Sequence, residues 1–326
     1  MDNNIELIEV LSDLGAGIHG SGFGSAAIRR LAGTQYNSDF SRLGRSTIYK
    51  PVSDGFGSYC AKNIESVLKI NRSISNVVCA SINKGNSPII ISGDHSNAAG
   101  TIAGIKMAKP NSVLGVIWID AHADLHSPYT TPSGNMHGMP LAASIAEDNA
   151  ESAVREIDSV TSFFWREFKN IGNISPKIQP QNIVYISLRD YEDEEYHLIR
   201  KRGIINYDAG FLINKGIENV VNRIFDQLEH CTDIYISFDV DCLDPLFSKG
   251  TGLPVQGGLL PGDAELLTGM LLGKPRVICM EVTEYNPFLD IDKRTAGIVY
   301  NILEKGVWAI NNRSLELREN CNICYV

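Results

Sequence analysis

Carboxylates and histidines gather directly after a strand-like apolar segment of the chain. Asp120, His122 and Asp124 follow the apolar run 113–119. In an extended backbone, residues two apart project from the same face, so we expect these three side chains to converge. Two carboxylates that converge repel each other unless a positive charge lies between them, and a divalent metal ion supplies it. For this segment alone, a solvated polar loop is the alternative interpretation.

The same pattern occurs at two further places. The run 234–238 leads into Asp239 and Asp241, and the run 88–93 is soon followed by His95. Three separate strands that each end in candidate ligands are difficult to explain as solvated loops. The predicted ligand set is His95, Asp120, His122, Asp124, Asp239 and Asp241.

The size and chemistry of this set indicate which metal it suits. A single zinc ion takes only three or four protein ligands. Six ligands, most of them oxygens, suit two adjacent harder ions, with Mn²⁺ as the leading choice and Co²⁺ as an alternative. Two such ions ~3.5–4 Å apart bridge and deprotonate one water molecule at neutral pH.

Strand-like and helix-like segments alternate along the chain, which predicts a single-domain, three-layer α/β/α fold with a mostly parallel sheet. Strands are expected at 5–10, 88–92, 113–119, 182–188, 204–207, 234–238 and 277–282. Helices are expected at 26–31, 57–70, 96–108, 163–168, 194–201, 217–228, 262–272 and 293–304. The segment 77–82 is either a strand or the end of a helix. Ligands of such sheets bind beyond the carboxyl ends of the strands, where the acidic loops lie.

We expect one domain over residues 1–310 and a polar C-terminal tail over 311–326. The net charge of −9 argues against nucleic-acid binding, which favours a basic surface. The apolar runs are far shorter than the ~20 residues that span a bilayer, so no membrane association is expected. The N-terminus lacks the features of a signal peptide, so we expect a cytoplasmic protein.

Two local motifs have a structural explanation that we prefer. Residues 15–20 match G-x-G-x-x-G, but further glycines delay the helix that a dinucleotide site requires, so a glycine-rich loop is favoured. Cys321 and Cys324 form a lone C-x-x-C, which we interpret as an incidental pair. The odd total of seven cysteines is typical of reduced thiols.

Three longer segments resemble the ureohydrolase family, which comprises arginase, agmatinase and formimidoylglutamase. They are Ser92-Gly93-Asp94-His95-Ser96, the segment 120–124, and Ser237-Phe238-Asp239-Val240-Asp241-Cys242-Leu243-Asp244-Pro245. The resemblance extends from about residue 5 to residue 305. It implies an arginase-like fold, two Mn²⁺ ions per chain, and hydrolysis of a C–N bond in a guanidino or formimino group.

Within the family, the loop 127–138 is most similar to the arginase loop that holds the amino-acid end of arginine. By this resemblance, Ser133 and Asn135 hold the α-carboxylate and His137 moves a proton, a task that suits histidine near neutral pH. Glu192 falls where arginases have an Asp near the α-amino group.

The resemblance also implies a carboxylate that pairs with the guanidinium. Glu284 matches it by its spacing to Asn286-Pro287, and Glu281 is the competing choice. Asp124 would both bind metal and accept a hydrogen bond from the attacking hydroxide. Two departures are His126, where many arginases have Asn that contacts the carboxylate, and Leu253, where many have Thr.

The resulting hypothesis is an arginase that hydrolyses L-arginine to L-ornithine and urea through a metal-bridging hydroxide. A formimidoylglutamase or agmatinase is the alternative within the family. A metal-free, arginase-like binding protein is the alternative from another class, but it predicts missing ligands and all six are present. The resemblance is also compatible with a homo-oligomer, because family members commonly form trimers or hexamers.

Overall fold

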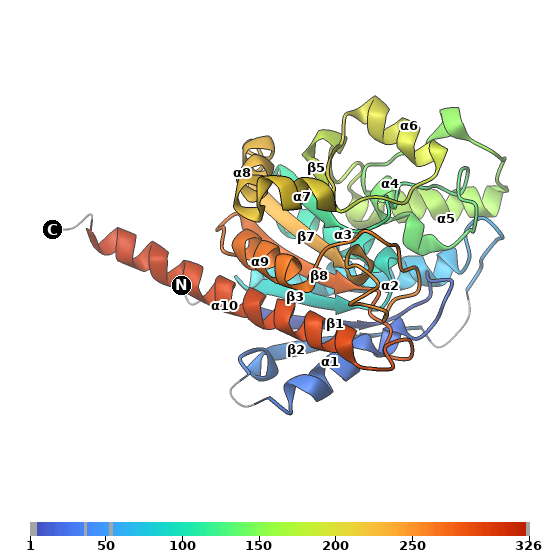
Figure 1. Cartoon of the computed structure of the whole chain (residues 1–326). Coiled ribbons are helices and arrows are strands. Elements are labelled where there is room, and N and C mark those ends of the chain that lie inside the picture. Colours follow the sequence, from blue (N-terminus) through green and yellow to red (C-terminus); the bar gives the residue numbers. More distant parts are fainter. Residues whose placement is uncertain (1–4, 36–37, 52–54, 324–326) are drawn as a thin grey trace.

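The computed structural model describes residues 5–35, 38–51 and 55–323, with residues 314–323 as backbone only (Figure 1). This part of the chain forms one eight-stranded sheet in which all neighbouring strands are parallel, in the order β2-β1-β3-β8-β7-β4-β5-β6. The strands are β1 (Ile5–Leu11), β2 (Gly44–Tyr49), β3 (Ser87–Ser92), β4 (Leu114–Ile119), β5 (Ile183–Ile186), β6 (Ile205–Tyr207), β7 (Asp233–Asp239) and β8 (Val277–Thr283).

Helices cover both faces of the sheet (Figure 1). They are α1 (Gly24–Ala32), α2 (Ile64–Asn83), α3 (Ala98–Ala108), α4 (Pro140–Ser144), α5 (Ser159–Lys169), α6 (Asp193–Arg202), α7 (Ala209–Lys215), α8 (Ile217–Gln227), α9 (Pro261–Leu272) and α10 (Arg294–Ile323). One core cluster joins the sheet to α1, α7, α8, α9 and α10, and another joins it to α2, α3 and α6. The predicted three-layer α/β/α fold is therefore confirmed.

The apolar runs form strands because both of their faces are covered. All of β3 and β4 is buried. In β3, Ile89 and Ile91 enter one core cluster and Ile90 enters the other. Such burial on both faces explains why these strands are continuously apolar rather than alternating. None of the helices in the described residues has both the length and the apolar character needed to cross a membrane.

Some predicted element boundaries were wrong. The helix expected at 57–70 begins at Ile64 because Asn63, with φ 56°, is left-handed, and it continues to Asn83, so the segment 77–82 is its end. The edge strand β2 was missed, since only Ile48 of its residues is buried and it lacks the apolar signal of a central strand. The last helix continues far beyond residue 304, and its end projects from the body (Figure 1). The predicted 311–326 tail thus has helical backbone to Ile323, whereas Cys324 lies outside the described residues.

The central strands β3, β8, β7 and β4 end side by side at one edge of the sheet. Gly93 follows β3 at this edge and donates its N–H to the Val10 carbonyl. A Cβ added at Gly93 would lie 2.2 Å from the carbonyl oxygen of Ser12, so the position has no room for a side chain. This close approach brings the end of β1 against the loop that carries His95.

We predict that Gly93→Ala lowers the free energy of unfolding by about 2–3 kcal/mol, because the neighbouring backbone must move. Urea denaturation measures this change. Gly44→Ala is the matched control, since an added Cβ meets nothing within 4 Å at that position. Equal effects of the two substitutions would contradict the steric explanation.

Candidate metal centre and active site

Asp120 and Asp239 begin the same local turn at the ends of two adjacent strands, β4 and β7. Asp120 Oδ1 accepts the backbone N–H of His122 at 2.7 Å, and Asp239 Oδ1 accepts that of Asp241 at 2.8 Å. Trp118 Nε1 also donates to Asp120 Oδ2 at 2.9 Å. One carboxylate oxygen of each residue therefore holds its own loop, which fixes the direction of the other oxygen.

The sequence analysis assumed an extended backbone for the segment 120–124, but the segment is not extended. Strand β4 ends at Ile119, and Asp124 adopts a left-handed backbone with φ 54°. A turn, rather than the alternation of a strand, brings Asp124 beside the other ligands. The expected convergence is present, but the turn hydrogen bonds produce it.

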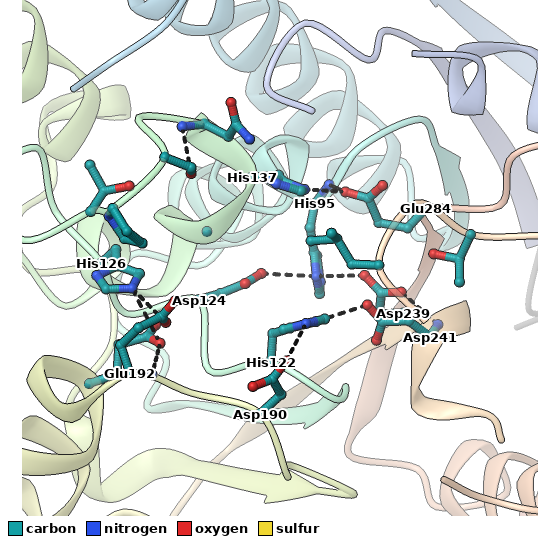
Figure 2. Close-up of a pocket in the computed structure, with 18 residues that line it drawn as sticks. His95, His122, Asp124, His126, His137, Asp190, Glu192, Asp239, Asp241 and Glu284 are labelled. Atoms are coloured by element: carbon teal, nitrogen blue, oxygen red, sulfur yellow. Dashed lines mark hydrogen bonds and ion pairs between the residues drawn. The ribbon is translucent and has the colours of Figure 1, made fainter. Parts of the chain in front are cut away.

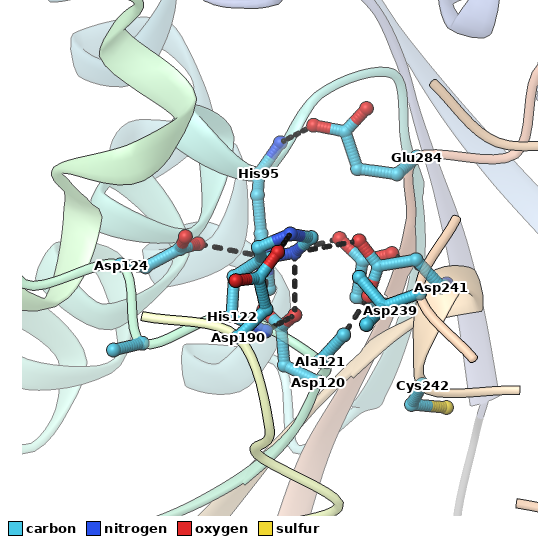
Figure 3. Close-up of polar contacts among 12 residues, drawn as sticks. His95, Asp120, Ala121, His122, Asp124, Asp190, Asp239, Asp241, Cys242 and Glu284 are labelled. Atoms are coloured by element: carbon cyan, nitrogen blue, oxygen red, sulfur yellow. Dashed lines mark hydrogen bonds and ion pairs between the residues drawn. The ribbon is translucent and has the colours of Figure 1, made fainter. Parts of the chain in front are cut away.

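A first cluster surrounds His95, which lies in a 3₁₀ turn after β3 (Figure 3). Its Nδ1 lies 3.0 Å from Asp120 Oδ2, 3.0 Å from Asp124 Oδ2 and 3.2 Å from Asp239 Oδ2. Within the described residues, His95 Nδ1 and Asp124 Oδ2 are buried atoms without a hydrogen-bond partner. Burial and the nearby carboxylates Asp241 and Asp120 raise the pKa of Asp239 well above its usual range. These groups fit a cation, which binds the unpartnered atoms and offsets the repulsion.

A second cluster lies next to the first and shares Asp120 with it. His122 Nδ1 lies 2.9 Å from Asp241 Oδ2 and 3.6 Å from Asp120 Oδ1. The ligand atoms of these three residues lie within 4.8 Å of one another. The structure thus brings all six predicted ligands into two adjoining groups, and the donor set fits two divalent ions.

A cavity of about 280 Å³ opens above these clusters (Figure 2). Glu284 lines it and is placed by a left-handed backbone with φ 63° at the end of β8. Glu284 Oε1 accepts the backbone N–H of His95 and lies 3.0 Å from His137 Nδ1. Glu281 is fully buried and does not line the cavity. Of the two competing glutamates, only Glu284 lines the cavity.

His137 is held in a form that can donate a proton. Burial of the ring opposes the charged form, but the hydrogen bond and charge of Glu284 outweigh it and raise the pKa of His137 to about 9. Its backbone N–H donates to the carbonyl of Gly15, so the glycine-rich segment 15–20 supports this loop.

The rim of the cavity carries the predicted residues for the amino-acid end of a substrate. His126 lines the cavity, but both of its ring nitrogens already contact protein groups: Nδ1 lies 3.1 Å from Thr130 Oγ1 and Nε2 lies 2.9 Å from Glu192 Oε2. The hydrogen bond between His126 Nε2 and Glu192 lowers the pKa of the Glu192 carboxyl to about 2. His126 therefore holds Glu192 and has no ring nitrogen left over for a ligand.

Ser133 and Asn135 also line the cavity. Asn135 Oδ1 accepts a hydrogen bond from Lys62 Nζ at 3.0 Å, which places a positive charge at this side of the rim. The sequence analysis missed Lys62 because no local motif marks it and it is 73 residues away in the chain. It also missed Asp190, which lines the cavity near His122 and follows the predicted strand 182–188.

Comparison with known proteins agrees with this geometry. The model of the arginase family matches residues 3–307. The chain belongs to the arginase family. It is 34% identical over 307 residues to the arginase of Bacillus caldovelox, which covers 92% of this chain and 96% of that protein. The arginase of Bacillus subtilis strain 168 is 34% identical over 310 residues, which cover 93% of this chain and 97% of that protein.

Solved structures extend the comparison to the fold. The structure of Entamoeba histolytica arginase in complex with L-ornithine has a TM-score of 0.82 at 27% identity and covers 94% of this chain and 98% of that chain. The formimidoylglutamase of Bacillus subtilis matches with a TM-score of 0.74 at 20% identity over 95% of this chain and 88% of that chain, which shows a shared fold alone. This member of the arginase family is therefore an enzyme of a hydrolase family whose members depend on metal.

The shared position of Asp120 predicts how metal binding responds to substitution. We expect wild-type protein to bind about two Mn²⁺ per chain. Asp120→Asn should weaken the binding of both ions, whereas Asp241→Asn should weaken mainly the binding of the ion beside His122. Equilibrium dialysis with elemental analysis measures both. Equal losses in the two variants would contradict the sharing of Asp120.

Proposed function

We propose that this enzyme is an arginase that hydrolyses L-arginine to L-ornithine and urea with two Mn²⁺ ions, Co²⁺ being the alternative metal. The observation that carries the proposal is the layout of one cavity. Its floor holds five of the six ligands, and the sixth, Asp120, belongs to both ligand clusters. Its wall holds Glu284 and His137, and its rim holds the groups suited to an α-amino acid. The similarity to several arginases supports the same substrate.

The metal-binding groups define the reaction centre. Bound to the two clusters, Mn²⁺ would supply a water molecule acidic enough to attack as hydroxide at neutral pH. In this proposal, His95, Asp124 and Asp239 would hold one ion, and His122 and Asp241 would hold the other. Asp120, which belongs to both clusters, would be shared between them. Asp124 is also assigned to accept a hydrogen bond from the attacking hydroxide.

The wall of the cavity orients the reacting group. Glu284 presents a carboxylate that pairs with the planar guanidinium mainly through Oε2, because Oε1 already accepts from the His95 N–H and contacts His137 Nδ1. His137 lies beside it and carries the proton that the leaving amine needs. Because its pKa is raised to about 9, the ring is protonated at neutral pH and ready to donate.

The rim distinguishes among the substrates of the family. Ser133 and Asn135 are assigned to the α-carboxylate, with the charge of Lys62 beside them. Glu192, held by His126, is assigned to the α-amino group. Agmatine lacks the carboxylate and would leave this side of the rim unpaired, which favours arginine. A cytoplasmic location and assembly into a homo-oligomer are further parts of the proposal.

A substrate panel tests the reaction directly. Purified enzyme loaded with Mn²⁺ should release urea from arginine with a kcat/KM at least about 100-fold above that for agmatine or 4-guanidinobutyrate, because unpaired polar groups at the rim penalise the incomplete substrates. Release of formamide from formiminoglutamate in preference to urea from arginine would contradict the proposal.

Two substitutions separate the assigned roles. Glu284→Gln should lower kcat/KM for arginine on the order of 100-fold by removing the carboxylate that pairs with the guanidinium. His137→Ala should lower kcat roughly 10²–10⁴-fold by removing a proton donor. Both variants should keep their bound metal, measured by elemental analysis. A His137→Ala protein that lost its metal would show that this role is misassigned.

A further inference from the structure

Lys62 lies in the turn just before α2 and is attached to the loop that forms the cavity rim. Its backbone N–H donates to the carbonyl of Gly134 at 2.8 Å. The two segments are in close contact, because a Cβ added at Gly134 would lie 2.0 Å from the carbonyl oxygen of Tyr59. The turn 59–62 is therefore packed directly against the loop that carries Asn135.

The side chain of Lys62 determines which way the amide of Asn135 faces. Lys62 Nζ lies 3.0 Å from Asn135 Oδ1. An ammonium group can only donate hydrogen bonds, so the amide atom that faces it must be the oxygen. The amide nitrogen Nδ2, with its two protons, is then directed away from Lys62.

Gly17 leaves the space that this orientation of the amide needs. A Cβ added at Gly17 would lie 2.6 Å from Asn135 Nδ2 but 3.7 Å from Oδ1, so the nitrogen is the amide atom nearer to Gly17. The amide thus lies between Lys62 and Gly17. Within the described part of the chain, Nδ2 donates to no protein group. Because Asn135 lines the cavity, this nitrogen is available to a ligand there.

Ser133, the other rim residue assigned to the α-carboxylate, is also left as a donor. Its Oγ accepts the backbone N–H of Asn135 at 3.2 Å, so its own proton remains for a ligand. Among the described residues, no carboxylate forms an ion pair with Lys62. Two hydrogen-bond donors beside an ammonium group that has no counter-ion fit an anionic group such as a carboxylate.

We propose that Lys62 is a positioning residue that keeps the Asn135 amide turned as a hydrogen-bond donor, and thereby selects guanidine substrates that carry a carboxylate. The inference rests on the proposed function, which assigns this part of the rim to the amino-acid end of the substrate. With the opposite orientation, the amide oxygen would face the carboxylate and repel it. Lys62 does not line the cavity itself, so it acts through Asn135.

Three single substitutions test this role. Lys62→Met removes the ammonium group and lets the amide turn, whereas Lys62→Arg keeps a cation that can only donate. Lys69→Met is the matched control, because it removes the same charge from α2, where Lys69 pairs with Glu65 at 2.7 Å. Steady-state kinetics of the Mn²⁺-loaded enzymes are measured with arginine and with agmatine, which lacks the carboxylate. Circular dichroism reports whether each variant is folded.

We expect Lys62→Met to raise the KM for arginine about 5–10-fold and to leave kcat within about twofold, because it weakens binding without changing the reaction centre. Its kcat/KM for agmatine should not fall, so the preference for arginine over agmatine decreases. Lys62→Arg and Lys69→Met should keep the KM for arginine within about twofold. A merely structural role of Lys62 would not separate KM from kcat in this way.

A double-mutant cycle with Asn135→Ala shows whether Lys62 acts through Asn135. In the Asn135→Ala background, Lys62→Met should change the KM for arginine by less than about twofold, because no amide is left to orient. If the two effects multiply instead, Lys62 acts by its charge alone and the inference is overturned.

An unchanged KM for arginine in folded Lys62→Met protein would also overturn the inference, as would an equal loss of activity with agmatine. Wild-type enzyme that does not prefer arginine to agmatine would instead contradict the proposed function, so the two failures are distinguishable.

Discussion

The crowding of four carboxylates at adjacent strand ends is the constraint on which the rest of the structure depends. Asp120, Asp124, Asp239 and Asp241 are all buried, together with His95. Like charges this close repel strongly in a medium of low dielectric, and each loses its hydration. Hydrogen bonds to their own loops offset part of this cost, and bound cations would offset the remainder. The loops are therefore shaped for ions before any substrate is considered.

The surrounding groups keep the ligands in place, and they give the cavity different charged groups at its floor, wall and rim. Arg189 donates to the carbonyls of Asp241 and Val255 at 2.7 and 2.8 Å, which ties together the loops that follow β5 and β7. Above this floor, Glu284 and His137 form a charged pair, and farther out Glu192 and Lys62 place opposite charges at the rim. An elongated molecule with a cationic end and an amino-acid end matches this order of charges. The proposed substrate specificity therefore depends on the same cavity that contains the metal ligands.

The sequence predicted the central strands and the family because both depend on short segments with strong signals. Buried parallel strands are continuously apolar, and the ligand motifs lie directly at their ends. The edge strand β2 was missed because only one of its residues, Ile48, is buried, which leaves no such pattern. The left-handed residues Asn63 and Asp124 were also missed, since their turns depend on local hydrogen bonds and contacts. Lys62 and the partners of His126 lie far apart in the chain, so only the fold brings them together.

Anomalous diffraction at the manganese absorption edge tests the central claim, that the strand-end carboxylates are held together by two cations. Crystals of the wild-type enzyme grown with Mn²⁺ should show two anomalous peaks ~3.5–4 Å apart. One should lie beside Nδ1 of His95 and the other beside Nδ1 of His122, with Asp120 in contact with both. A single peak, or two peaks that do not share Asp120, would contradict this account of the site.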